Sequence, residues 1–278
     1  MVKTLLVALD GTADGEAALS LGIEWARRHE ALLVGLVVVD EPGLHYPEER
    51  ILGEAPHFRK IDQRLLRELT GEGERVLGAA TLRCAREGVP FKPLEVAGSP
   101  CDRICREAER YDLILLGRES LREGFSERPD DALTRILRRS PRPVVVVPSG
   151  CRSAGAVLIA YDGSLQAART LQAFEASGLI GGRAVHVVSV HEDPREAARR
   201  AGRAVEFLSA HRIEAAPVIV SEPGGADPAS VMLAHAETLD AGLLVMGVYG
   251  QSALRELFLG STTRTMLREA PVPLFVWH

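Results

Sequence analysis

The stretch Thr4–Thr12 (T-L-L-V-A-L-D-G-T) decides the fold, because the chain repeats its pattern at Ala156–Ser164 (A-V-L-I-A-Y-D-G-S), at an offset of 152 residues. Each copy is an apolar run that ends in Asp-Gly followed by a hydroxyl residue. The next apolar runs also end alike, at Val37–Pro42 and Ser189–Pro194, with the same offset. Self-similarity sustained in this way indicates two copies of one structural unit.

A third agreement lies near the end of each copy, where Asp112–Gly117 corresponds to Gly242–Gly247 at an offset of 130 residues. The first copy therefore carries 22 additional residues, mostly between residues 43 and 88. We place the boundary near Gly150, which gives one domain over residues 1–150 and a second over residues 151–278.

Each copy alternates short apolar runs with helical stretches, which predicts strands and helices in turn. The strands are expected at Leu5–Leu9, Leu32–Val39, Phe91–Val96, Leu113–Leu116 and Val144–Val147, then at Val157–Tyr161, Ala184–Val190, Pro217–Val220, Leu243–Met246 and Leu274–Trp277. Helices are expected at Gly15–His29, Arg59–Glu87 and Asp102–Arg110, among others. Apolar runs without in-out alternation are typical of parallel strands covered on both faces. The predicted fold class is α/β, with two tandem five-stranded, doubly wound, Rossmann-like domains.

The amino-acid composition and net charge of the chain limit the classes of partner that it is expected to bind. Of 278 residues, 46 % are hydrophobic and 26 % charged, which is typical of a globular protein with a real core. A net charge of −5 argues against nucleic acid and against an anionic membrane as partners. No apolar run reaches the roughly 18 residues of a membrane span, so we expect a cytoplasmic protein. The four cysteines form no CxxC pair and no disulfide framework is expected.

The residues most informative about function are Met246–Gly250 and Gly260–Thr263. Gly247 and Gly250 follow a predicted strand, where glycine lets the backbone turn and approach a ligand. Gly260 and Ser261 then open a helix, whose free N–H groups attract an anion. Asp162 ends the neighbouring strand and suits a ribose hydroxyl or a base amine. The pattern predicts a phosphate cradle, and the alternative is a glycine turn followed by an ordinary capped helix.

On these residues the chain resembles the universal stress proteins, in their tandem form. The family's ATP-binding signature, Gly-x2-Gly-x9-Gly-Ser/Thr, is met by Gly247, Gly250, Gly260 and Ser261, and the strand-one aspartate by Asp162. The resemblance implies that ATP and Mg²⁺ bind here. It also implies roles for Ala160, Tyr161 and Asp162 at the adenine and ribose, and for Val190 against the base. Met246 and Gly247 would follow the ribose and α-phosphate, Gly250 the phosphate turn, and Gly260, Ser261 and Thr262 the β- and γ-phosphates.

The first copy departs from this signature. Gly117 is kept, but Ser120 stands for Gly250, and Asp130 and Asp131 stand for Gly260 and Ser261. Carboxylates close to a triphosphate repel it unless a metal ion intervenes. Although this copy keeps Asp10 and Val38, we expect it to bind ATP weakly or in an altered mode, the latter through Arg118, Arg122 or Arg128.

The first functional hypothesis is a nucleotide-dependent regulator of a stress response, whose occupancy alters its association with an unidentified protein partner. The alternatives are an ATP-using enzyme, either a slow ATPase or a phosphotransferase, and a scaffold that binds no nucleotide. The chain has no Walker A motif and no Gly-x-Gly-x-x-Gly at the first strand end, which argues against P-loop NTPases and dehydrogenases.

The last strand of each copy is short, apolar and expected at a sheet edge, at Pro143–Val147 and Pro273–Trp277. Unpaired edges favour association with an equivalent strand. We therefore expect the two copies to form an internal pseudo-dimer through these strands, and two chains could associate further as a homodimer.

Overall fold

The computed structural model describes residues 1–40, 55–119, 129–221, 227–248 and 260–278. For residues 55–69 and 129–131 it describes the backbone, and for all the others the side chains as well. The chain forms two compact units. One comprises residues 3–141, and the other comprises residues 1–2 with 142–278.

The first unit alternates strands and helices along the chain. Its elements are β1 (Thr4–Ala8), α1 (Ala13–His29), β2 (Leu32–Val39), α2 (Ala55–Arg86), β3 (Phe91–Ala97), α3 (Pro100–Ala108), β4 (Leu113–Gly117) and α4 (Pro129–Arg139). The strands lie in the order β3-β2-β1-β4, and β1 pairs in parallel with both β2 and β4. The chain order therefore reverses between β1 and β4, which makes this a topological switch point.

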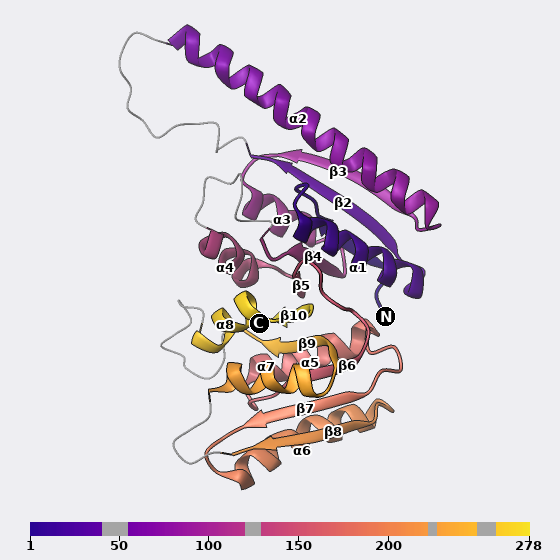
Figure 1. Cartoon of the computed structure of the whole chain (residues 1–278), viewed down its shortest axis with the longest axis vertical. Coiled ribbons are helices and arrows are strands. Elements are labelled where there is room, and N and C mark those ends of the chain that lie inside the picture. Colours follow the sequence, from indigo (N-terminus) through magenta and orange to yellow (C-terminus); the bar gives the residue numbers. More distant parts are fainter. Residues whose placement is uncertain (41–54, 120–128, 222–226, 249–259) are drawn as a thin grey trace. The chain divides into compact units, whose positions relative to one another are not determined.

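The second unit repeats that plan (Figure 1). Its elements are β5 (Val144–Val147), β6 (Ala156–Ala160), α5 (Leu165–Ser177), β7 (Val185–Val190), α6 (Pro194–Ala210), β8 (Ala215–Val220), α7 (Pro228–Thr238), β9 (Ala241–Gly247), α8 (Ser261–Glu269) and β10 (Leu274–Trp277). The strand order is β5-β10-β9-β6-β7-β8, with the switch point between β6 and β9. All its described pairings are parallel except that of β10 with β5.

The sheets are covered on both faces, which explains their continuous apolar strands. In the second unit α5 packs against α6 and α7 against α8. Right-handed crossovers place the first pair on one face and the second pair on the other. Every residue of β4 and β5 is buried, and so is every residue of β9 except Gly247. The predicted α/β class with mostly parallel, doubly wound sheets is confirmed.

The core is aliphatic with a few aromatic side chains at its centre. Phe174 of α5 and Phe275 of β10 are fully buried, with ring centroids 5.2 Å apart in an edge-to-face arrangement. Trp25 of α1 is also buried. Each of these large side chains buries more apolar surface than a single aliphatic side chain of the core and stabilises it accordingly.

The elements agree with the sequence-based expectations to within a few residues. The helix expected at Arg59–Glu87 is α2, which begins at Ala55 and has 32 residues where α6 has 17. Part of the additional sequence of the first copy is therefore a longer helix, while residues 43–54 lie outside the described residues. The expected pairing of the last strands is present, since β5 and β10 are antiparallel with Val145 opposite Phe275. No helix in the described ranges is both long and apolar enough to span a bilayer.

Candidate functional site

Asp162 lies in a tight turn between β6 and α5, at the carboxyl edge of the sheet. Its Oδ1 accepts a hydrogen bond from the Ser164 backbone N–H at 2.9 Å, and Gly163 between them has φ +77°. Ser164 then caps α5, with Oγ accepting from the Ala167 N–H at 3.1 Å. The Asp-Gly-hydroxyl sequence thus specifies both the turn and the start of the helix.

The first copy builds the same turn from the same pattern. Asp10 Oδ1 accepts from the Thr12 backbone N–H at 3.0 Å and from its hydroxyl at 2.8 Å, and Thr12 caps α1. Gly11 has φ +77°, identical to that of Gly163. The repeat recognised in the sequence is therefore a repeat of local structure.

Removing the side-chain cap of α5 should lower the stability of the protein. Ser164→Ala leaves the Ala167 N–H without its acceptor, and we expect a loss of about 1 kcal/mol in the free energy of unfolding. Denaturant titration followed by circular dichroism measures it. Ser209→Ala, at the exposed C-terminal end of α6, is the matched control and should change stability by less than about 0.5 kcal/mol.

Gly247 ends β9 directly beside the start of α5. A Cβ at this position would lie 2.7 Å from the Ala167 nitrogen and 2.8 Å from the Gln166 carbonyl carbon. Glycine is required here because the strand end and the first turn of α5 touch through backbone atoms. One strand over, Ala160 of β6 is in register with Met246 of β9, so both reach the same edge of the sheet.

Gly260 is the N-cap of α8. Among the described residues beyond its chain neighbours and its own helix, no atom lies within 4 Å of the position that a Cβ would occupy, and no side chain caps the helix. Ser261 is exposed, Thr262 half-buried and Thr263 buried. Because β9 ends at the carboxyl edge and α8 leads back to β10, this helix starts at the edge where Asp162 lies. Uncapped N–H groups at such a start favour an anion.

The remaining predicted site residues lie near this edge or outside the described ranges. Tyr161 is buried, and its N–H donates to the Val188 carbonyl at 2.9 Å. Val190 is half-buried at the end of β7, in register with Val220 of β8. Gly250 falls outside the described residues. The structure thus brings Ala160, Tyr161, Asp162, Val190, Met246 and Gly247 to the carboxyl edges of three adjacent strands.

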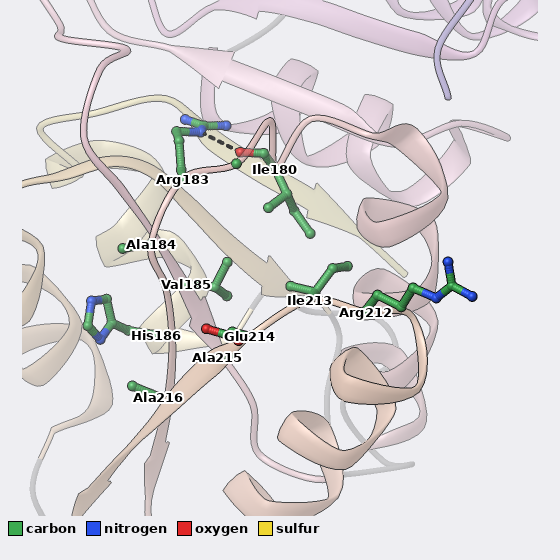
Figure 2. A pocket seen from close by; sticks show the side chains of 11 residues that line it. Ile180, Arg183, Ala184, Val185, His186, Arg212, Ile213, Glu214, Ala215 and Ala216 are labelled. Carbon is green, nitrogen blue, oxygen red and sulfur yellow. Dashed lines mark hydrogen bonds between the residues drawn. The ribbon is translucent and has the colours of Figure 1, made fainter.

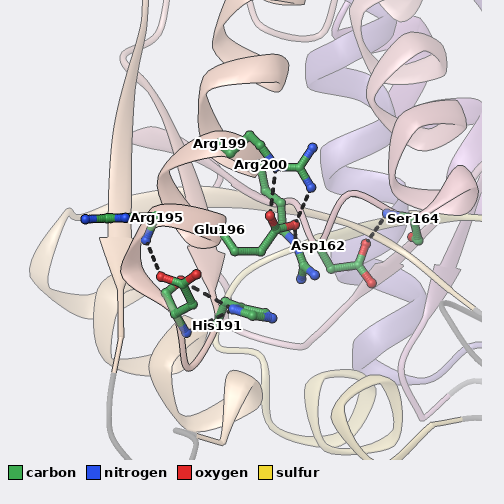
Figure 3. A network of polar contacts seen from close by, with 8 residues as sticks. Asp162, Ser164, His191, Arg195, Glu196, Arg199 and Arg200 are labelled. Carbon is green, nitrogen blue, oxygen red and sulfur yellow. Dashed lines mark hydrogen bonds and ion pairs between the residues drawn. The ribbon is translucent and has the colours of Figure 1, made fainter.

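Beside Asp162 stands a network of charged side chains on α6 (Figure 3). Glu196 accepts hydrogen bonds from Arg199 at 2.7 and 2.8 Å, and from Arg200 Nε at 2.8 Å. The Arg200 side chain is only 15 % exposed. These arginines lower the pKa of Glu196 to about 2. Glu196 therefore remains ionised and holds Arg200 in place at every ordinary pH.

This pKa can be measured directly. We expect the Glu196 carboxyl carbon to titrate near 2 in NMR spectra, because its hydrogen bonds to Arg199 and Arg200 stabilise the ionised form. Arg199→Gln together with Arg200→Gln removes both donors and should return the pKa toward about 4.3. A pKa near that value in the unmodified protein would contradict the described network.

The first copy differs at the equivalent of the predicted phosphate cradle. Asp14, in the first turn of α1, is 4 % exposed, and its Oδ2 accepts from the Glu119 backbone N–H at 2.9 Å just after β4. The second copy has Gln166 at the corresponding position. Asp130 and Asp131 lie in the first turn of α4, while Ser120 lies outside the described residues. A buried carboxylate and two acidic residues at a helix start all disfavour a phosphate.

Comparison with known proteins agrees with this duplicated architecture. The model of the universal stress protein family matches residues 1–148 and again residues 155–278. The chain belongs to the universal stress protein family. Two matches within one chain make it a tandem member.

Individual relatives extend the likeness. A universal stress protein of Synechocystis sp. is 31 % identical over 174 residues, which cover 60 % of this chain and 58 % of that protein. A solved universal stress protein from Archaeoglobus fulgidus has 22 % identity and a TM-score of 0.72, covering 99 % of this chain and 95 % of that one. One from Pseudomonas aeruginosa has 18 % identity and a TM-score of 0.57, covering 99 % and 93 %. At these identities the solved structures show a shared fold.

A separate hollow of about 660 Å³ lies at the amino ends of β7 and β8 in this universal stress protein (Figure 2). It is lined by Ile180, Gly182, Arg183, Ala184, Val185, His186, Arg212, Ile213, Glu214, Ala215 and Ala216. The Arg183 guanidinium donates to the backbone carbonyls of Ile180, Ser153 and Leu179. Because this hollow is at the opposite edge of the sheet from Asp162, it is not part of the candidate site.

Within the described ranges, no group of three or more His, Cys, Asp or Glu side chains could hold a metal ion. Cys84, Cys101 and Cys105 are buried and not joined in disulfides, and burial raises the pKa of Cys84 to about 11. Cys101 and Cys105 lie on the buried face of α3.

No role near the candidate site was predicted for Glu196, Arg200 and Arg203 of α6, or for Asp14 of α1. The only available signal was the density of arginines between residues 195 and 203. That signal does not indicate which arginine faces the neighbouring turn.

Proposed function

We propose that the second copy, residues 151–278, binds ATP with Mg²⁺ at the carboxyl edge of β6 and β9. The observation that carries this proposal is the start of α8. No described residue beyond its chain neighbours and own helix lies within 4 Å of where a Cβ of Gly260 would be, and α8 has no described side-chain cap, whereas α4 in the first copy begins with acidic residues. A helix start of this kind accommodates phosphate without rearrangement.

Each residue of the proposed site then has a definable role in binding the nucleotide. Asp162 offers an acceptor for a ribose hydroxyl, while Ala160, Tyr161 and Val190 give the base an apolar surface. The N–H groups of the first turn of α8 and the hydroxyls of Ser261 and Thr262 donate to phosphate oxygens. Mg²⁺, held by those oxygens, neutralises part of the triphosphate charge.

In this proposal the protein is a nucleotide-dependent regulator in a cytoplasmic stress response, rather than a dedicated enzyme. Nucleotide occupancy changes its affinity for a protein partner. The first copy, residues 1–150, completes an internal pseudo-dimer through the pairing of β5 with β10, and two chains associate further as a homodimer.

Calorimetric titration of the nucleotide-stripped protein with ATP and Mg²⁺ tests the proposal. One binding site per chain is expected. Two sites would show that the first copy also binds, and no heat at any concentration up to millimolar ATP would overturn ATP binding and favour a scaffold. Phosphate release measured in the same samples separates a binding protein from a slow ATPase.

A further inference from the structure

The turn that holds Asp162 faces different side chains in the two copies. In the first copy, a Cβ on Gly11 would lie 3.4 Å from Cγ2 of Val76 on α2. In the second copy, a Cβ on Gly163 would lie 2.8 Å from Nη2 of Arg203 and 3.3 Å from Cγ of Arg200, both on α6. The second helix of each copy thus passes the same turn, with an apolar contact in one case and two arginines in the other.

These arginines give this place a fixed positive charge. Glu196 is shared between Arg199 and Arg200, so one carboxylate balances two guanidinium groups. Among the residues that the structure describes, Arg203 makes no ion pair with a carboxylate. The hydrogen bond to Glu196 already holds the Arg200 side chain in place. Binding an anion there would therefore cost less side-chain entropy.

The position of the charge indicates which anion would use it. The phosphate chain is expected at α8, on the other side of Asp162 from α6, since β6 lies between β9 and β7. Arg200 and Arg203 instead lie against Gly163, the residue that follows the aspartate assigned to the ribose. In nucleotide-binding α/β folds, an arginine beside the acidic ribose-binding residue accommodates a phosphate carried on the ribose.

We propose that Arg200 and Arg203 bind a phosphate group esterified to a ribose hydroxyl, so that the second copy prefers adenine nucleotides phosphorylated on the ribose as well as at the 5′ position. This inference rests on the proposed nucleotide site. Each guanidinium donates to phosphate oxygens, and the planar fork of arginine suits this geometry.

The test compares ADP with adenosine 2′,5′-bisphosphate and adenosine 3′,5′-bisphosphate, which carry the same two phosphates in different places, and uses 5′-AMP as the reference. In calorimetric titrations of the full chain, one of the bisphosphates should bind about tenfold more tightly than 5′-AMP. Arg203→Gln should remove this gain and leave the affinity for ADP within about twofold. Arg195→Gln is the matched control, since Figure 3 shows Arg195 on the same helix extending away from Asp162.

The outcomes separate the two proposals. If ATP binds but neither bisphosphate gains over 5′-AMP, or if Arg195→Gln removes the gain as fully as Arg203→Gln, the ribose-phosphate site is wrong and the ATP site stands. If a bisphosphate binds in an Arg203-dependent way and ATP does not, the ribose-phosphate site stands and the triphosphate assignment is wrong. Absence of binding by ATP and by all four of these nucleotides overturns both.

Discussion

Replacing Gly260 and Ser261 together with aspartate should weaken ATP binding about 100-fold or more, because a carboxylate and a phosphate about 4 Å apart repel by about 4 kcal/mol at an effective dielectric constant near 20. The double substitution places at the start of α8 the two aspartates that the first copy has at the corresponding positions, Asp130 and Asp131. Titration calorimetry of the variant beside the unmodified protein measures the loss.

The melting temperature of this variant is the control measurement. Acidic residues in the first turn of a helix interact favourably with its dipole, so the melting temperature should not fall. The reverse substitution, Asp130→Gly with Asp131→Ser, should not create a second site, because the buried carboxylate of Asp14 still accepts from the Glu119 N–H after β4. ATP binding unaffected by Gly260→Asp/Ser261→Asp would show that α8 is not the phosphate site.

Gly247→Ala and Gly260→Ala should have opposite consequences, although both replace a glycine of the same signature. At Gly247 the new methyl group would lie 2.7 Å from the Ala167 nitrogen, so β9 and α5 must separate. Such overpacking should lower the free energy of unfolding by about 1–3 kcal/mol. At Gly260 the methyl group meets no described residue beyond its chain neighbours and its own helix, so stability should change by less than about 0.5 kcal/mol while ATP affinity falls.

Denaturant unfolding and ATP titration of both variants distinguish packing from ligand contact. Gly202→Ala, on an exposed position of α6 where the added methyl group meets no described residue outside its own helix, is the control for substituting glycine as such. Equal loss of stability at positions 247 and 260 would refute the separate roles assigned to the two glycines.

The repeat and its turns could be predicted from the sequence because they depend on local chemistry. An aspartate followed by glycine and a hydroxyl residue specifies the turn and the helix cap from neighbouring residues alone, and the structure forms this turn at Asp10 and at Asp162. The continuous apolar strands likewise predicted a parallel sheet with two covered faces. Helix limits were less accurate, as α3 begins at Pro100 rather than Asp102, because a proline suits the first helical turn.

The other site features depend on packing between segments far apart in the chain. Gly247 was interpreted as a place for close ligand approach, yet the atoms that exclude a side chain there belong to α5, some 80 residues away in sequence. Arg200 and Arg203 lie against the turn at Gly163 only because α6 packs on β7 and β8 with one particular rotation. The bond from Glu119 to Asp14 joins residues 105 positions apart. No spacing rule along the chain predicts contacts of this kind.

Hydrogen–deuterium exchange of the full chain with and without ATP and Mg²⁺ locates the bound nucleotide and so tests whether the second copy holds it. We expect slower exchange in peptides covering residues 161–167 and 260–264, where backbone N–H groups would meet the ligand. The corresponding peptides of the first copy, residues 9–15 and 129–134, should be unchanged. Protection confined to the first copy, or equal protection in both copies, would contradict it.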